Sequence, residues 1–226
     1  MNERSVRLLP AQMVTGFPNL LRPIAEWLIR MHVRPNTITS ASVIVVIGAA
    51  AAFGLDQPRL GALWLLVSGL LDILDGQVAR RGGMASKFGA FFDSTLDRIG
   101  EAALYAGIAI YFQTAAAQAR PVLGVIAALA ALTGSFLVSY ARARAEGLGV
   151  DCRVGIAQRP ERILGVGAPT LFFGSGPHGI LLLVIIAILA IVSWVTVAQR
   201  VAFVFRATNG ADGGPGAPAG SAPKGN

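Results

Sequence analysis

The chain has 226 residues, of which 54% are hydrophobic and only 14% are charged, and its formal net charge is +7. Soluble globular domains carry about a quarter charged residues, so this composition excludes an ordinary soluble protein and indicates an integral membrane protein. The positive charge does not indicate a nucleic-acid partner, because Lys and Arg are distributed as in the cytoplasmic loops of membrane proteins.

The N-terminal segment, residues 1–35, is predicted to be cytoplasmic and to contain an amphipathic helix. Within residues 17–31, apolar residues such as Leu20, Ile24 and Trp27 share one side of a helix, and charged residues share the other. This pattern predicts a helix that lies in the membrane interface. An ordinary helix packed on the rest of the protein would show the same pattern, and the two interpretations are compatible.

Six transmembrane helices are predicted in one domain of residues 36–206. A helix needs about 20 apolar residues to cross a bilayer, and the predicted segments are 37–55, 60–81, 88–112, 121–141, 163–173 and 180–198. Segment 163–173 is the weakest, since it contains two glycines and a proline. With six spans both termini are cytoplasmic, and of the 19 basic residues only Arg59 and Arg120 lie outside.

The predicted fold class is therefore all-α: a six-helix membrane bundle with an N-terminal interfacial helix. We expect a multi-pass protein of the cell (inner) membrane, surrounded by membrane lipids. The last segment, residues 207–226, consists mainly of Gly, Pro, Ala and Ser, a composition that predicts a disordered tail.

Four carboxylates interrupt the second and third predicted spans. Asp72 and Asp75 lie three residues apart and Asp93 and Asp97 lie four apart, so each pair shares one face of its helix. A short basic connection with two glycines, residues 81–87, would join the two helices in an antiparallel arrangement. An unpaired carboxylate in the hydrocarbon region costs at least ~2.5 kcal/mol, so this cluster needs cations.

Oxygen donors without a nearby His or Cys suit hard divalent ions, so the cluster predicts a site for Mg²⁺ or Mn²⁺, with room for two ions. Such ions complete their shells with water and phosphate, which predicts a phosphate-bearing substrate. Gly76 and Gly89 allow close approach of a ligand, and Arg80 is placed to neutralise a phosphate. Alternatively, the acids form buried salt bridges with Arg80 and Arg98, or Arg98 pairs with Glu101 along one helix.

These polar residues form one continuous pattern, Asp72-x2-Asp75-Gly76-x2-Ala79-Arg80-x8-Gly89-x3-Asp93-x3-Asp97. The pattern resembles, at all eight fixed positions and without a gap, the signature of the CDP-alcohol phosphotransferase family. The resemblance implies a cytoplasm-facing site with two metal ions, in which an alcohol displaces CMP from a CDP-linked lipid, usually CDP-diacylglycerol. It also implies a homodimer.

Roles for individual residues follow from the resemblance, position by position. It implies that the metal ligands are Asp72, Asp75, Asp93 and Asp97, and that Asp97 also takes the proton from the attacking hydroxyl. It implies a CDP site lined by Gly76, Ala79 and Arg80, with Gly89 permitting close approach. Asn36 and Thr39, which can also cap the first span, are further candidates for the CDP site.

Three arginines after the fourth span, Arg142, Arg159 and Arg162, are candidate acceptor-binding residues. Residues 139–146 and 159–162 resemble the loops of prokaryotic phosphatidylinositol phosphate synthases and their archaeal relatives, which use inositol 1-phosphate, although Glu101 replaces an expected Asp. A dianionic acceptor needs several cations beside the metal site, which these arginines can supply. Glycerol 3-phosphate is also an anion, and the arginines could instead bind anionic lipid headgroups, so both alternatives stay open.

The sequence thus predicts a membrane enzyme that transfers a phosphatidyl group from CDP-diacylglycerol to a phosphorylated polyol. Inositol 1-phosphate is the preferred acceptor, and the alternative within the family is a phosphatidylglycerol phosphate synthase that uses glycerol 3-phosphate. An alternative of another class is a cation or proton transporter, because intramembrane acids often line ion pathways. The clustering of the acids near one face, together with Arg80 and two glycines, favours a phosphate ligand over a bare ion.

Overall fold

The computed structural model describes residues 20–114, 119–152, 154–156 and 159–212, with side chains up to residue 209. All regular secondary structure in these residues is helical, which confirms the predicted all-α class. The elements are α2 (Arg22–Arg30), α3 (Pro35–Gly54), α4 (Pro58–Arg81), α5 (Lys87–Thr114), α6 (Pro121–Glu146), α7 (Arg159–Phe173), the 3-10 turn η1 (Pro177–Gly179) and α8 (Ile180–Asp212).

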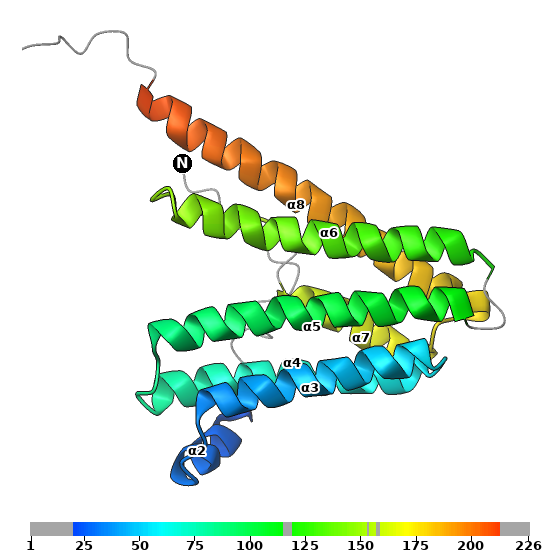
Figure 1. The fold of residues 1–226 in the computed structure, drawn as a ribbon, viewed down its shortest axis with the longest axis horizontal. Helices are drawn as coiled ribbons and strands as arrows, with labels where there is room; N and C mark the ends of the chain where they lie inside the picture. The colour runs from blue at the N-terminus through cyan, green and yellow to red at the C-terminus, as the bar shows by residue number, and fades with distance from the viewer. Residues whose placement is uncertain (1–19, 115–118, 153, 157–158, 213–226) are drawn as a thin grey trace, which may run out of the picture.

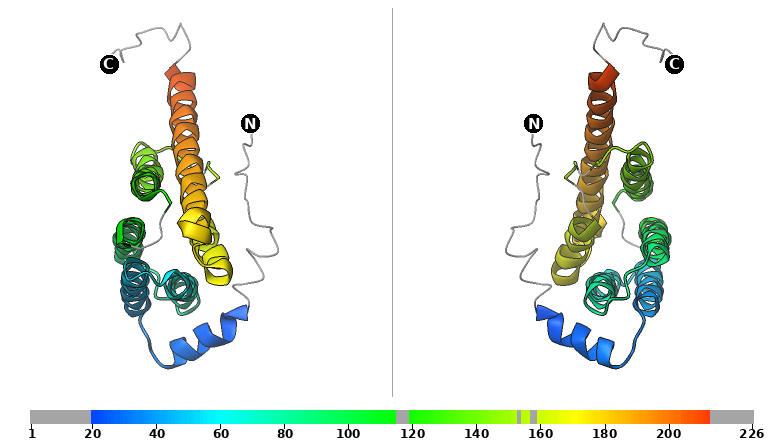
Figure 2. Two further views of the ribbon diagram at one scale, coloured as in Figure 1. Left: turned by 90° about the vertical axis from the view of Figure 1, so that its right-hand side faces the viewer. Right: turned by 90° about the vertical axis from the view of Figure 1, so that its left-hand side faces the viewer.

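Six of the helices form a closed ring (Figures 1 and 2). Helix α3 packs on α4 and α5, α5 packs on α6, and α6 packs on α8, while α7 completes the ring between α4 and α8. The short helix α2 lies outside the ring and packs on α4. Because α3 contacts both α4 and α5, it supports the two helices that carry the predicted metal ligands.

Four of the described helices are long and apolar enough to cross a membrane: α3, α4, α6 and the continuous helix of η1 and α8. Helix α7 has only 15 residues, and the first half of α5 carries ionisable side chains, so neither is an apolar span by length and composition. The structure therefore supports a membrane protein, while the count of six spans remains a prediction.

The apolar core fills the end of the bundle away from the carboxylates, where α3 ends and α4 begins. Large side chains such as Phe53, Leu65, Ile108 and Phe112 are fully buried there. A glycine permits the closest helix crossing, since a Cβ on Gly107 of α5 would lie 2.2 Å from the Ala50 carbonyl oxygen of α3. Apolar side chains also cover the outside of the bundle, as expected in lipid; they include Ile44, Ile47, Leu63, Ile126, Ile188 and Ile191.

The apolar residues at the N-terminus divide into two sets. Leu21 and Ala25 are buried against Leu74 and Val78 of α4, so part of the predicted apolar side packs on the bundle. The rest of that side is exposed, namely Leu20, Ile24, Trp27 and Met31. Residues 1–19, including the predicted start of this helix, lie outside the described residues.

At the other end of the chain, α8 continues to Asp212. The sequence predicted that the transmembrane domain ends at residue 206. The helix thus extends into the segment that was predicted as a tail. Residues 213–226 lie outside the described part of the chain.

Candidate functional site

The four predicted metal ligands come from the C-terminal half of α4 and the N-terminal half of α5. Asp72, Asp93 and Asp97 are partly exposed, whereas Asp75 is 6% exposed. The carboxylates are close enough to interact electrostatically, since Asp93 acts on each of the other three and Asp72 acts on Asp75 and Asp97. The helical spacing therefore brings all four acids to one site, as the sequence predicted.

Arg159, the first residue of α7, joins the two carboxylate helices. Its Nη1 donates to Asp72 of α4 and lies 2.6 Å from Asp97 Oδ1 of α5. The side chain is 18% exposed, and its buried Nε has no hydrogen-bond partner among the residues that the structure describes. A cation supplied by this chain is thus held between two of the predicted metal ligands.

Two hydroxyls of α3 orient the carboxylates of α4. Thr39 Oγ1 donates to Asp75 Oδ2 at 2.7 Å, and Ser42 Oγ donates to Asp72 Oδ1 at 2.7 Å. The place of Thr39 in the CDP site stays a prediction, and its hydroxyl contacts the carboxylate of Asp75. Ser42 was missed, although its position three residues after Thr39 places it on the same face of α3.

The remaining CDP-site candidates lie around the carboxylates. The Arg80 guanidinium lies across Gly76, since a Cβ on this glycine would be 3.0 Å from Arg80 Nη1. Asn36 lies beside Gly89, with its Oδ1 3.4 Å from the position of a Cβ there. Ala79 is partly exposed on α4 and Arg80 is exposed. No acidic side chain within the described ranges forms an ion pair with Arg80, which leaves it available to an anionic ligand.

A second cluster surrounds Glu101, one turn beyond Asp97 on α5. Glu101 is 7% exposed and accepts hydrogen bonds from Arg98 on its own helix, Arg162 of α7 and, at 2.7 Å, Ser135 of α6. The alternative that Arg98 pairs with Glu101 is therefore confirmed. Arg162 is 5% exposed and contacts this glutamate, so the structure brings only Arg159 of the three predicted arginines directly to the aspartates.

Arg142, the third predicted acceptor residue, lies on the last turns of α6. It is half exposed and pairs with Glu146 of the same helix at 2.8 Å. No contact of Arg142 with the aspartates is present among the described side chains.

The donor set fits divalent cations by its chemistry and charge. Four ionised carboxylates carry four negative charges. Arg159 contacts two of them and Arg98 lies 4.0 Å from Asp97, so at least two charges are uncompensated, which is costly in a partly buried site. No three His, Cys, Asp or Glu side chains of the described residues converge closely enough to hold an ion as they stand. The Arg159 bridge explains this, because the guanidinium separates Asp72 from Asp97.

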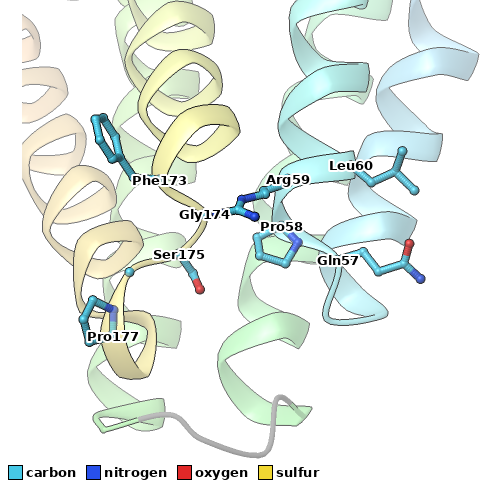
Figure 3. A pocket seen from close by; sticks show the side chains of 9 residues that line it. Gln57, Pro58, Arg59, Leu60, Phe173, Gly174, Ser175 and Pro177 are labelled. Atoms are coloured by element: carbon cyan, nitrogen blue, oxygen red, sulfur yellow. The ribbon is translucent and has the colours of Figure 1, made fainter.

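A separate cavity of about 610 Å³ lies at the opposite end of the bundle, between the start of α4 and the turn after α7 (Figure 3). Arg59 extends from α4 toward Gly174 and Ser175 of that turn. Arg59 is the only charged residue of its lining, and the cavity contains none of the predicted site residues. The carboxylate cluster, which has four acids and nearby arginines, is therefore the candidate site.

Comparison with known proteins gives consistent matches over most of the chain. The family described as CDP-alcohol phosphatidyltransferase matches residues 32–207. The archaetidylinositol phosphate synthase of Methanothermobacter thermautotrophicus is 37% identical, covering 81% of this chain and 88% of its own. The phosphatidylinositol phosphate synthase of Cutibacterium acnes is 37% identical, and the match covers 85% of this chain and 95% of that protein.

Solved structures of the phosphatidylinositol phosphate synthase of Mycobacterium tuberculosis also match, at 34% identity and a TM-score of 0.70. The match with the structure that has CDP-DAG bound covers 81% of this chain and 92% of that chain. The match with the structure in complex with manganese and citrate covers 81% of this chain and 88% of that chain.

Proposed function

This chain belongs to the CDP-alcohol phosphatidyltransferase family, and on that premise we propose that it makes a phosphoinositide-type lipid. The enzyme transfers a phosphatidyl group from CDP-diacylglycerol to inositol 1-phosphate and releases CMP. The observation that carries the proposal is that Asp72 and Asp75 of α4 lie near Asp93 and Asp97 of α5, and that the guanidinium of Arg159 from α7 contacts Asp72 and Asp97. The two synthases and the structure with CDP-DAG described above support the choice of substrates.

The four aspartates would hold two divalent ions, Mg²⁺ or Mn²⁺. When bound, such ions supply charge neutralisation of the donor diphosphate and stabilise the departing CMP. The similar enzyme solved with manganese supports a divalent ion at this site. Thr39 and Ser42 fix the orientation of Asp75 and Asp72, because each hydroxyl donates to one carboxylate oxygen; the other oxygen of Asp72 is the one that Arg159 contacts.

The chain's own groups position the donor and move one proton. Arg80 binds a phosphate of the CDP group across Gly76, where a larger residue would meet its guanidinium, and Asn36 and Ala79 line the same site. Asp97 accepts the proton of the attacking hydroxyl. The hydroxyl oxygen forms a bond to the β-phosphorus as the bond from that phosphorus to the CMP oxygen breaks, so no covalent enzyme intermediate is needed.

Arginines provide the acceptor site in this proposal. Arg159 is the main contact to the acceptor phosphate because it already lies among the catalytic carboxylates. Arg142 and Arg162 are further contributors; the buried Arg162 acts by fixing the start of α7 through Glu101. A phosphorylated acceptor matches this positive charge better than a neutral alcohol does.

We also propose the membrane arrangement that this chemistry needs. Helices α5 and α7 complete a bundle of six spans in the cell (inner) membrane, with the carboxylates facing the cytoplasm and both termini on that side. Helix α2 lies in the interface with its exposed apolar residues toward lipid. The enzyme works as a homodimer.

In the deciding experiment, purified protein is incubated with radiolabelled CDP-diacylglycerol, Mg²⁺ and either inositol 1-phosphate or glycerol 3-phosphate. CMP release and lipid product are measured. We expect product with inositol 1-phosphate alone. Product with glycerol 3-phosphate alone would make the chain a phosphatidylglycerol phosphate synthase. No transfer, together with metal-dependent cation flux in sealed vesicles without nucleotide, would support a transporter instead.

A further inference from the structure

We propose that Arg159 is an exchangeable counter-ion of the carboxylate site. Its guanidinium lies between Asp72 and Asp97 until divalent ions bind, and it is then released to bind the phosphate of the acceptor. The exchange would make metal loading a precondition for acceptor binding. The acceptor part of this inference rests on the proposed function, whereas the competition with metal does not.

The contacts of Arg159 are those of a competitor for metal. One nitrogen, Nη1, reaches an oxygen of Asp72 and an oxygen of Asp97, so it occupies oxygens of two residues that would hold the ions. The Nε has no hydrogen-bond partner among the described residues, so within them the ion pairs of the side chain are made through Nη1. A group held in this way can leave when its two carboxylates acquire other cations.

The negative charge of the four carboxylates would be neutralised when two divalent ions bind. Without ions, the single positive charge of Arg159 faces four carboxylates and is attracted to them. Two divalent ions would bring four positive charges to the same four carboxylates, so the guanidinium would then meet a neutral site containing two cations. The attraction that holds Arg159 is lost, and an incoming phosphate dianion becomes its better partner.

The backbone that carries Arg159 is fixed independently. Arg162 lies one turn further along α7, is 5% exposed and is bound to Glu101, which Arg98 and Ser135 also contact. This cluster ties α7 to α5 and α6, and it adjoins the aspartates through Arg98, which lies 4.0 Å from Asp97. Only the side chain of Arg159 therefore has to move, and it moves at the edge of the site rather than with the helix.

The exchange predicts thermodynamic coupling between the ligands. If metal binding frees Arg159 for the acceptor, metal must raise the affinity for the acceptor, and the acceptor must raise the affinity for metal by the same factor. The coupling should depend on Arg159 and should be lost when that side chain cannot bind either group.

The first test measures Mn²⁺ affinity by electron paramagnetic resonance on the purified full chain, without donor or acceptor. We expect Arg159→Gln to bind Mn²⁺ about tenfold more tightly than the unsubstituted protein, with a lower melting temperature without metal and an equal one at saturating Mn²⁺. Arg144→Gln, which removes the same charge from an exposed position of α6, should behave like the unsubstituted protein. Unchanged or weaker Mn²⁺ binding by Arg159→Gln, or an equal shift in melting temperature with and without metal, would overturn the exchange.

The second test titrates inositol 1-phosphate into the unsubstituted protein and Arg159→Gln by calorimetry, with and without Mn²⁺. We expect Mn²⁺ to tighten binding at least about tenfold in the unsubstituted protein and to have much less effect in the variant. Equal coupling in both proteins would overturn the release of Arg159 to the acceptor. If inositol 1-phosphate binds neither protein, the proposed acceptor is wrong, while the Mn²⁺ affinities and melting temperatures still decide the competition with metal.

Discussion

Two acidic clusters lie one helical turn apart on α5, and they differ in charge balance. Around Asp97, four carboxylates share Arg159 and a more distant Arg98, which lies 4.0 Å from Asp97, whereas around Glu101 two guanidinium groups and a hydroxyl share one carboxylate. The first cluster, which we call unbalanced, has fewer positive than negative charges and is partly open; in the second, which we call balanced, Glu101 and Arg162 are buried and paired with each other. The comparison supports the proposal that the unbalanced cluster is the reactive one, while the balanced cluster holds three helices together.

The largest expected effect comes from removing an acid of the unbalanced cluster. Asp97→Asn should lower the transfer rate about 10⁴-fold, because both the proton acceptor and a metal ligand are lost. Its melting temperature without metal should not fall, since one of four repelling charges is removed. The measurement is CMP release together with thermal unfolding in detergent.

The matched control is Asp56→Asn, which changes an exposed turn residue at φ 58°, a backbone conformation that Asn adopts readily. Its rate should equal that of the unsubstituted protein. A rate for Asp97→Asn within tenfold of the unsubstituted protein would place the proton acceptor elsewhere.

Next in size is the acid of the balanced cluster. Glu101→Gln removes the counter-ion that Arg98 and the buried Arg162 share, so the free energy of unfolding should fall by about 3–5 kcal/mol. Denaturant unfolding in mixed micelles measures this loss. Glu146→Gln removes an acid from the exposed pair with Arg142 and should cost at most about 1 kcal/mol. Equal losses in the two variants would remove the distinction between the clusters.

Removing a hydroxyl that supports the unbalanced cluster should have an intermediate effect. Ser42→Ala deletes the donor to Asp72 Oδ1 and should weaken Mn²⁺ binding about tenfold, the usual scale for a group that orients a metal ligand. Thr39→Val, which deletes the donor to Asp75, should act similarly. Mn²⁺ titration of both variants is the measurement, and unchanged affinity in both would show that α3 does not orient the ligands.

The smallest effect should come from the hydroxyl in the balanced cluster. Ser135→Ala leaves Glu101 with two arginines, so it should cost about 1 kcal/mol of unfolding free energy and leave Mn²⁺ affinity unchanged. Ser94→Ala, on the exposed part of α5, is the control and should be neutral. A change in Mn²⁺ affinity for Ser135→Ala would mean that the two clusters are coupled.

The convergence of the four aspartates could be predicted from the sequence because it depends on local geometry. Spacings of three and four residues determine which side chains share a helix face, and a short connection limits how two successive helices can pack. The boundaries of α4 and α5 follow from Pro58 at the start of α4 and from glycines after its end, so they were also predictable.

The partners of the arginines could not be predicted, because they depend on how distant helices pack. Arg159 and Arg162 are three residues apart and looked equivalent in the sequence. The approach of α7 to α4 and α5 places Arg159 at Asp72 and Asp97, and Arg162 at Glu101. Sequence spacing contains no information about that approach.

Helix α5 has a consequence for the biogenesis of the protein. It carries Asp93, Asp97, Arg98 and Glu101, and single acidic or basic residues cost ~2.5–3.5 kcal/mol each when a helix enters a bilayer alone. In the six-span arrangement α5 cannot partition into lipid as an independent segment. It must pack against α3, which it contacts. Its polar residues must also form ion pairs with α7, which is synthesised later. Insertion of this helix is therefore completed only after translation has passed Arg162, and a chain truncated before α7 should leave α5 outside the membrane.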